Sequence, residues 1–400
     1  DWIIDLGPGA GARGGEVVFA GPYDELVRSR DSVTAQFLRG RERPASPVSP
    51  RPARGDEPAW VTIKDARAHN LRGIDVALPV GRFSCLTGVS GSGKSSLLVD
   101  VLYGNALRLR GQPVDSVGAC GKIEGLDAFA DVVLVDQAPL GRSSRSNPAT
   151  YLKAMDELRQ RFAKSKDAER LGLAAGAFSF NVPADKGGGR CEVCGGHGTQ
   201  TLEMHFLADV TVVCDGCDGR RFSEKILGVK WGGLSILDCL QLTVDEALAR
   251  FAAGKETRRL RERLQPFADV GLGYLQLGQP TATLSGGESQ RLKLAAHLQP
   301  GAGPTLFLLD EPTTGLHGRD VDVLLAALAR LVAAGHTVVA IEHNLDFIRR
   351  ADWLVDLGPE GGVGGGALVC AGSVDDVAAC RASHTGRALA ALARSERRRG

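Results

Sequence analysis

The chain has 400 residues, of which 43% are hydrophobic and 24% are charged, and its formal net charge at pH 7 is +1. The length predicts two or three domains, and the composition is that of a globular protein. A net charge so close to zero excludes a uniformly basic nucleic-acid-binding chain, so any DNA-binding surface has to be a local patch. No run approaches the roughly 20 apolar residues of a membrane-spanning helix, and no signal peptide is present, so we expect a cytoplasmic protein with no membrane partner.

The first recognisable feature along the chain is an internal repeat. DWIIDLGP at residues 1–8 recurs as DWLVDLGP at residues 352–359, and both copies continue through a glycine-rich turn into a second apolar run. Each copy predicts a strand, a glycine turn, a strand and a helix. The second copy closes a large module, so residues 1–40 are expected to be the closing segment of a preceding, truncated module. Because the chain also starts without methionine, we expect a fragment or a processed product.

A linker and an α/β module follow. Residues 41–59 combine prolines with arginines and serines, which predicts an extended linker without a core. Beyond them, short apolar or alternating runs predict strands, and a periodicity of about 3.6 residues predicts helices. The expected strands are 60–63, 73–78, 83–87, 131–135, 306–309 and 337–341, and the expected helices are 95–109, 151–163, 243–253 and 320–334. Continuous apolar runs such as 306–309 favour central strands of a parallel sheet that is covered on both faces.

A P-loop joins the third expected strand to the first expected helix. GVSGSGKS at residues 88–95 allows backbone N–H groups to surround phosphate oxygens, while Lys94 reaches the β- and γ-phosphates and Ser95 ligates Mg²⁺. The alternative is a glycine-rich turn before an ordinary helix, which the complete spacing and the strand–loop–helix context disfavour. The candidate nucleotide ligands in this segment are Gly88, Ser90, Gly91, Gly93, Lys94, Ser95 and Ser96.

Acidic and polar residues at the ends of other strands predict the rest of a hydrolytic site. Asp310 follows an apolar run and is placed to join the Mg²⁺ shell, and Glu311 is placed to polarise the attacking water. His343 follows another apolar strand, which favours a γ-phosphate contact over a purely structural histidine. Gln137 follows an earlier strand and is the candidate that senses the metal ion and the attacking water.

LSGGESQ at residues 284–290 narrows the class of ATPase. Ser285, Gly286 and Gly287 open a helix, so free N–H groups and the positive end of the helix dipole face an anion. Together with the P-loop and the polar strand ends, this motif predicts an ABC-type P-loop ATPase cassette of the α/β class that uses ATP and Mg²⁺. In ABC ATPases the motif closes over nucleotide held by the opposite cassette, so we expect one cassette alone to hydrolyse ATP slowly.

Two CxxC pairs lie between the P-loop and the signature motif. Cys191 and Cys194 form the first pair, Cys214 and Cys217 the second, and 19 residues separate the pairs. Four thiolates at this spacing can surround Zn²⁺ tetrahedrally, and a site with all four positions taken is structural rather than catalytic. The alternative is four reduced cysteines near the surface. The other cysteines are scattered and are expected to act as small buried hydrophobes.

Further segments resemble the UvrA family of bacterial nucleotide excision repair. They are GRSSRSNPATY at 141–151, FSFN at 178–181, GRCEVC at 189–194, EMHFL at 203–207, GQP at 278–280, EHNLD at 342–346 and SHTG at 383–386. The resemblance runs through almost the whole chain, which looks like the C-terminal half of such a protein. An inserted zinc module within an ABC-type cassette is also similar to that family.

This resemblance implies the organisation of the chain. Residues 1–40 would close a truncated first ABC cassette, 41–59 would be the linker, and 60–150 would carry the P-loop part of the second cassette. An inserted signature-domain region would occupy 151–283, with the zinc module at about 190–221; the signature and Asp310 part would span 284–383, and a basic tail 384–400.

The family's function is implied in the same way. UvrA proteins are ATPases of the excinuclease system, linked to DNA excision and the SOS response, which dimerise, sense distorted DNA and load UvrB. The implied partners are therefore double-stranded DNA with lesions, a second copy or a first-cassette half, and UvrB. Candidates for DNA contact are Arg142, Arg145, Lys186, Arg190, His205, Arg220 and Arg221. The alternative for each is a solvated basic residue in a polar loop.

Some features depart from the family pattern. The loop 184–188 is longer than usual, Ala208 replaces a common proline, and the first cassette, the other zinc site and the UvrB-binding domain have no counterpart in this sequence. These differences indicate a diverged paralogue, of a kind associated with resistance to DNA-damaging compounds, rather than the main repair protein. A transporter cassette, an ABC translation factor and a truncated ATPase inactive without its first cassette are the remaining alternatives. The first two would lack the paired cysteines.

Overall fold

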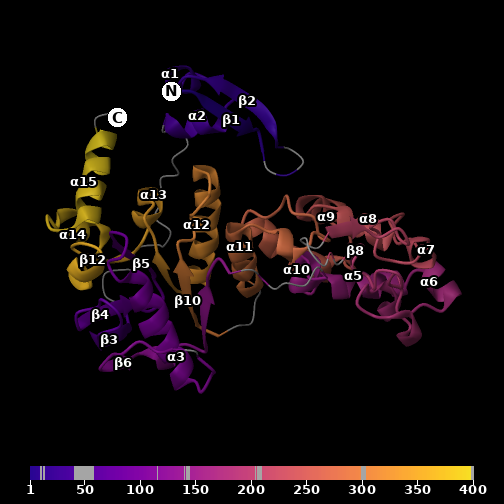
Figure 1. Ribbon diagram of the computed structural model, residues 1–400, viewed down its shortest axis with the longest axis horizontal. Coiled ribbons are helices and arrows are strands. Elements are labelled where there is room, and N and C mark those ends of the chain that lie inside the picture. The colour runs from indigo at the N-terminus through magenta and orange to yellow at the C-terminus, as the bar shows by residue number, and fades with distance from the viewer. Residues whose placement is uncertain are drawn as a thin grey trace. The chain divides into compact units, whose positions relative to one another are not determined.

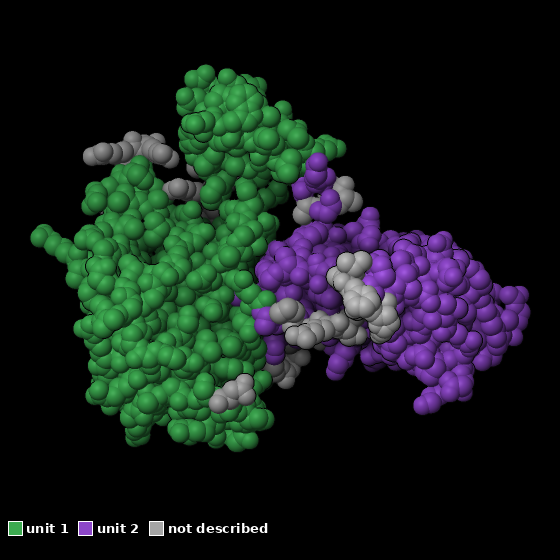
Figure 2. Space-filling model, viewed as in Figure 1, with its two compact units in different colours: residues 1–8, 16–137, 300–400 green, residues 9–15, 138–299 purple. Residues whose placement is uncertain are grey.

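The computed structural model describes residues 1–9, 11, 14–39, 58–114, 116–138, 140, 145–202, 204, 210–298 and 303–397. The chain divides into two compact units (Figure 2). Unit 1 comprises residues 1–8, 16–137 and 300–400, and unit 2 comprises residues 9–15 and 138–299. In the described ranges, no helix combines the length and the apolar character needed to cross a membrane.

A six-stranded sheet forms the centre of unit 1 (Figure 1). Its order is β13 (Ala367–Gly372), β12 (Trp353–Gly358), β5 (Phe83–Gly88), β11 (Thr337–Ile341), β10 (Thr305–Asp310) and β7 (Asp131–Val135). Neighbouring strands are parallel except for β13, which is antiparallel to β12. The carboxyl ends of β5, β10 and β11 therefore meet at one edge, where ligands bind in parallel α/β sheets.

The two faces of this sheet are covered by different elements, because alternate side chains of a strand point to opposite faces. On one face, residues such as Leu306 and Leu308 join a core with a helix that follows the P-loop and with a small sheet. That helix is η2, a π-helix (Ser96–Tyr103) continued by α3 (Gly104–Leu109), and the small sheet contains β3 (Trp60–Ala66), β4 (Ile74–Pro79) and β6 (Lys122–Glu124).

Helices cover the opposite face of the sheet. They include α12 (Gly318–Ala333), which packs on β11 and β5, and α15 (His384–Arg397), which packs on β5. Phe83 of β5 makes an edge-to-face contact with Phe347 of α13 (Leu345–Ile348), with ring centroids 5.2 Å apart. The expectation of an α/β fold with a parallel sheet is confirmed.

Both copies of the repeat fold as a hairpin followed by helices. The first copy contains β1 (Ile3–Gly7), β2 (Glu16–Gly21), α1 (Tyr23–Leu26) and α2 (Val33–Leu38), and the second contains β12, β13, α14 (Val374–Ala379) and α15. The register shifts between Asp5 and Leu6 in one hairpin and between Asp356 and Leu357 in the other. The repeated sequence therefore specifies the same irregularity twice.

Unit 2 is mainly helical. Its helices are α4 (Pro148–Tyr151), α5 (Ala154–Ala163), α6 (Lys166–Leu171), α7 (Glu224–Leu227), α8 (Ile236–Gln241), α9 (Val244–Arg250), α10 (Arg258–Asp269) and α11 (Gly286–His297), and β8 (Thr199–Leu202) pairs with β9 (Val210–Val213). The single helix expected over 151–163 is divided. Lys153 has a φ of 60°, a left-handed conformation that cannot continue a helix and so separates α4 from α5.

Candidate functional site

The P-loop follows β5 and leads directly into η2, as the sequence predicts. Gly88 has a φ of 129°, and a Cβ there would lie 2.0 Å from the Leu357 carbonyl oxygen, so only glycine fits this position. Lys94 is buried, and its Nζ donates to the carbonyl oxygens of Gly88 at 3.0 Å and Val89 at 2.8 Å. The backbone at the start of the loop thus binds the ammonium group of the loop's own lysine.

Two segments outside the P-loop hold it in place. The Gly91 carbonyl accepts the Asn70 side-chain amide at 2.8 Å and the Gly362 N–H at 3.0 Å. The Gly366 N–H donates to the Ser92 carbonyl at 3.1 Å. Sequence reasoning missed this support, although the repeated glycine-rich turn was a signal that the backbone passes close to another segment.

Lys94 has three acidic neighbours. Burial lowers the pKa of Lys94, and the negative charges of Glu311, Asp356 and Asp310 oppose that effect. Burial also raises the pKa of Asp310, an effect that Glu311 and Asp136 reinforce and Lys94 counteracts. Polyphosphate beside Lys94 and a divalent cation beside Asp310 would each supply the missing opposite charge, so the donor set fits a Mg²⁺–nucleotide pair.

The three catalytic candidates converge at the ends of β10, β11 and β7. His343 Nε2 lies 3.7 Å from Glu311 Oε1, and Gln137 Nε2 donates to the Glu311 carbonyl oxygen at 3.4 Å. Glu311 itself has a φ of 45°, unusual for a residue with a side chain. Its N–H donates to the Ile341 carbonyl at 3.1 Å, which ties this conformation to the end of the neighbouring strand.

Two buried carboxylates beside this edge were not assigned from the sequence. Glu342 accepts the N–H groups of Thr313 at 2.7 Å, His343 at 2.8 Å and Asn344 at 2.9 Å, so it fixes the backbone that carries His343. Asp356 accepts the hydroxyl groups of Thr87 at 2.7 Å and Thr385 at 2.9 Å. An acidic residue inside or directly after an apolar strand was the available signal for both.

The signature motif forms the start of α11 in unit 2. Ser285 caps the helix: its Oγ accepts the Glu288 N–H at 3.2 Å, and Glu288 Oε2 accepts the Ser285 N–H at 2.8 Å. This reciprocal pair satisfies two backbone donors of the first turn. Gly286 and Gly287 follow as the first helical residues, so an anion could approach the remaining N–H groups without meeting a side chain.

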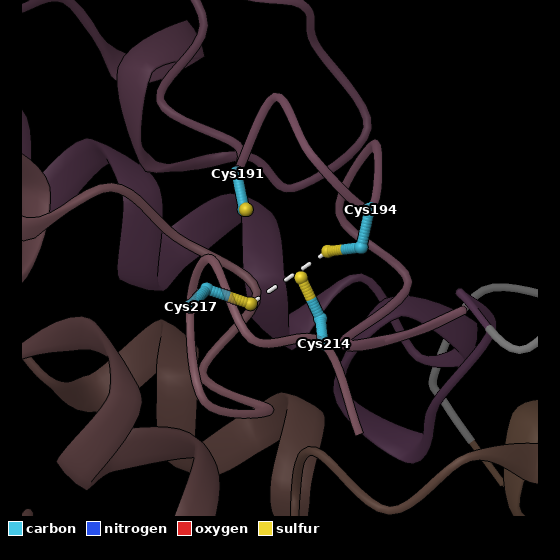
Figure 3. A group of neighbouring side chains, drawn as sticks. All are labelled: Cys191, Cys194, Cys214 and Cys217. Atoms are coloured by element: carbon cyan, nitrogen blue, oxygen red, sulfur yellow. Dashed lines mark hydrogen bonds between the residues drawn. The ribbon is translucent and has the colours of Figure 1, made fainter. Parts of the chain in front are cut away.

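The structure brings the four paired cysteines together in unit 2 (Figure 3). All four are buried, their Sγ atoms lie within 4.8 Å of one another, and the Sγ atoms of Cys194 and Cys217 are 3.7 Å apart. Tetrahedral Zn²⁺ with bonds of about 2.3 Å places sulfur atoms about 3.8 Å apart, so this donor set fits the ion. Burial raises the pKa of Cys217 to about 12. A bound cation would stabilise the thiolates that burial disfavours.

Basic residues gather beside this cluster. Arg145 Nη2 lies 2.8 Å from His197 Nε2. Burial lowers the pKa of His197, and the positive charges of Arg145, Arg221 and Arg190 lower it further, so three of the candidate arginines act on one imidazole. The Arg221 guanidinium also lies 5.7 Å from the centre of the Phe180 ring.

The remaining DNA candidates are arranged differently. The Arg220 guanidinium lies 2.6 Å from the Glu224 carboxylate and donates to the Cys217 carbonyl at 3.0 Å. The Glu224 carboxylate therefore partly neutralises the charge that Arg220 could offer to DNA. Lys186 is exposed at the end of a short turn, residues 184–186. Arg142 and His205 lie outside the described residues.

A scan against models of protein families finds no match. The chain is 48% identical over 393 residues to UvrABC system protein A from Thermus thermophilus. This alignment covers 98% of this chain and 40% of that protein. It is also 48% identical over 410 residues to UvrABC system protein A from Mycobacterium bovis, with 100% of this chain and 41% of that protein covered. UvrA2 from Deinococcus radiodurans has a similar structure, with a TM-score of 0.87 and 43% sequence identity over 98% of this chain and 46% of that one.

The chain thus spans about 40% of the length of the curated relatives that it matches. The sequence likeness extends along almost all of the chain and includes the P-loop strand, the signature helix and the cysteine cluster described above. With the close structural likeness to UvrA2, it shows that the chain belongs to the UvrA family.

Proposed function

We propose that the chain binds and hydrolyses ATP as the part of a UvrA-type protein that recognises damaged DNA for nucleotide excision repair. The observation that carries this proposal is the meeting of Lys94, Asp310, Glu311 and His343 at one sheet edge, in a chain 48% identical to UvrABC system protein A. The name of these relatives favours excision repair over a role in resistance or in transport.

Each group at the sheet edge has a separate task in this proposal. Lys94 and the P-loop N–H groups bind the β- and γ-phosphates, and Ser95 and Asp310 hold Mg²⁺, which neutralises phosphate charge. Glu311 accepts a proton from the attacking water, and Gln137 orients that water. His343 donates a hydrogen bond to the γ-phosphate. The Glu342 carboxylate fixes the position of His343, because it accepts the backbone N–H groups of His343 and Asn344.

Hydrolysis on this proposal requires a second cassette. Ser285 and the two glycines after it bind the γ-phosphate of nucleotide held by a partner, either a first-cassette half or another copy. Residues 1–40 close such a first cassette. Support comes from their internal repeat and from Ile4 and Leu6, which are exposed although the equivalent residues of the second copy are buried.

The cysteine cluster holds Zn²⁺ as a structural ion and supports a DNA-binding surface. Arg145, Arg190 and Arg221 around His197 supply the local positive charge that the whole chain lacks. A lesion that makes the duplex easier to bend would bind better to a surface that contacts mainly phosphates. UvrB, which the resemblance implies, remains the proposed recipient of the DNA.

Two substitutions test the ATPase assignment in the full chain. Lys94→Ala removes the counter-charge to the phosphates and should abolish ATP binding. Glu311→Gln should retain ATP binding but lower the hydrolysis rate at least about a hundredfold, because the amide cannot accept the proton. Fluorescent ATP titration and phosphate release at several protein concentrations measure both. Hydrolysis by Glu311→Gln at the parental rate would contradict the role of Glu311.

Metal analysis and DNA titration test the second unit. Natively purified chain should contain one equivalent of zinc, and Cys214→Ala should lose it while Cys239→Ala, a buried cysteine outside the cluster, keeps it. The parental chain should bind a lesion-bearing duplex more tightly than an intact one, and both affinities should fall with salt. Equal, salt-insensitive affinities would leave an ATPase without DNA sensing.

A further inference from the structure

The capping box of the signature helix has a third member. Tyr274, in the turn that follows α10, donates its hydroxyl to Glu288 Oε1 at 2.5 Å. The other carboxylate oxygen, Oε2, accepts the Ser285 N–H at 2.8 Å. One carboxylate therefore links the tyrosine hydroxyl to the backbone of the signature serine, and both of its oxygens have a defined donor.

The turn that carries Tyr274 is anchored on two sides. The buried Arg291, one turn after Glu288 on α11, donates Nη1 to the Gly271 carbonyl at 3.3 Å. On the other side, the Asp245 N–H at the start of α9 donates to the Gly273 carbonyl at 2.9 Å. A Cβ at Gly273 would lie 2.1 Å from the Asp245 carboxylate, so a side chain at this position would require that carboxylate to move. Tyr274 is consequently held against α11 by its own backbone.

The orientation of the Ser285 hydroxyl follows from this arrangement. Its oxygen accepts the Glu288 N–H, which leaves the hydroxyl proton for another acceptor, and the residue is exposed. Glu288 is also an anion near the place where a γ-phosphate would bind, and its charge would repel that phosphate if the side chain turned outward. A donor that holds the carboxylate against the protein prevents this.

We propose that Tyr274 is a positioning residue for the signature motif: through Glu288 it fixes the Ser285 hydroxyl and keeps the carboxylate away from the partner's nucleotide. Burial, and then the hydrogen bond to Glu288, raise the pKa of Tyr274, so its hydroxyl remains a donor across the physiological range. The activity part of this inference rests on the proposed ATPase function, whereas the hydrogen-bond part does not.

The test uses Tyr274→Phe in the full chain, with Tyr151→Phe as the matched control. Tyr151 is a half-buried tyrosine of the same unit, and burial is the cause that raises its pKa. Hydrogen exchange of the peptide covering 284–290 should become roughly tenfold faster in Tyr274→Phe, because the freed carboxylate no longer protects the Ser285 N–H. Tyr151→Phe should exchange at the parental rate.

The kinetic readout distinguishes positioning from general destabilisation. Tyr274→Phe should lower kcat for ATP roughly tenfold while the Kd for ATP, set by the P-loop, stays unchanged. Adding Tyr274→Phe to Glu288→Ala should lower kcat no further than Glu288→Ala alone, because the tyrosine acts through that carboxylate. If hydrogen exchange of the 284–290 peptide is unchanged in Tyr274→Phe, the inference is overturned, whatever the activity. Faster exchange combined with a parental kcat would also overturn it. A parental chain that stays inactive even with a partner cassette supplied would count against the proposed ATPase. Faster exchange in Tyr274→Phe would still support the hydrogen-bond linkage in that case.

Discussion

Ile4 and Leu6 of β1 are 62% and 64% exposed, whereas Val355 and Leu357, at the equivalent positions of β12, are 0% and 1% exposed. The two hairpins otherwise share their register and their shift. β12 has a second neighbour, since it pairs in parallel with β5 and contributes to the core with η2 and the small sheet. In the described part of the chain, β1 pairs with β2 alone.

The comparison separates local from long-range causes of structure. In both copies an aspartate at the middle of the first strand accepts a threonine hydroxyl from the following helical segment: Thr34 to Asp5 at 2.8 Å and Thr385 to Asp356 at 2.9 Å. These contacts need only residues of the same copy. Burial of the apolar face needs another segment, and the second copy has one in the strand and helix around the P-loop.

The largest difference between the copies is expected for their apolar residues. Leu357→Ala should lower the free energy of unfolding of unit 1 by about 2–5 kcal/mol, because it leaves a cavity in the core. Leu6→Ala should change it by less than about 0.5 kcal/mol, since Leu6 is already in water. Denaturant unfolding of both variants measures this pair. Equal losses would mean that the first hairpin is also covered, as it would be by a bound cassette or a second copy.

The glycine turns provide the next comparison. Gly366 and Gly15 have φ values of 78° and 84°, so alanine is strained at either position. At Gly366 the new Cβ would also lie 1.7 Å from the Asn70 carbonyl oxygen, whereas nothing lies within 4 Å at Gly15. Gly15→Ala should therefore cost about 1 kcal/mol and Gly366→Ala about 3 kcal/mol.

Only the second of these alanines should also affect nucleotide binding. Gly366 donates its N–H to the P-loop at Ser92, so displacing this turn should weaken ATP binding in the titration described above. Gly15→Ala is the control for backbone strain alone. If both variants bind ATP as the parental chain does, the glycine turn does not support the P-loop.

A smaller difference is expected for the aspartates. Asp356 is buried and accepts a hydroxyl from Thr87 of the P-loop strand as well as from Thr385, while Asp5 is half-buried and accepts hydroxyls from Ser32 and Thr34. Asp356→Asn should cost about 2 kcal/mol in denaturant unfolding, because hydrogen bonds to a buried charge are lost. Asp5→Asn should cost less than about 1 kcal/mol, measured by hydrogen exchange of the first hairpin. A larger loss in Asp5→Asn would reverse the ranking.

The smallest effect should be the same in both copies. Thr385→Val and Thr34→Val each remove a hydroxyl–carboxylate bond of nearly equal length, and Thr34→Val also removes a 3.4 Å contact with His317 Nε2. Because that second contact is long, each substitution should raise amide exchange in its own hairpin by the equivalent of about 1 kcal/mol. A difference of more than about 1 kcal/mol between them would show that even this contact depends on its surroundings.

The candidate site could be predicted where its chemistry depends on local spacing. The P-loop, the two CxxC pairs and the signature serine each lie within a few consecutive residues, and the structure gives each the expected strand, turn or helix. The prediction of one continuous helix over 151–163 was wrong, because the periodicity of apolar residues carries no information about a single left-handed residue such as Lys153.

The sequence by itself determined the α/β order, the cysteine cluster, the polar residues that meet at one sheet edge and the shared fold of the two hairpins. Only the tertiary structure decided which hairpin is buried, that Asn70 and Gly366 support the P-loop, and that Tyr274 reaches Glu288. The physical reason is that hydrogen-bonding motifs and side-chain periodicity act between residues near in sequence. Burial and support of a loop depend instead on segments that are distant in the sequence and meet only in the folded chain.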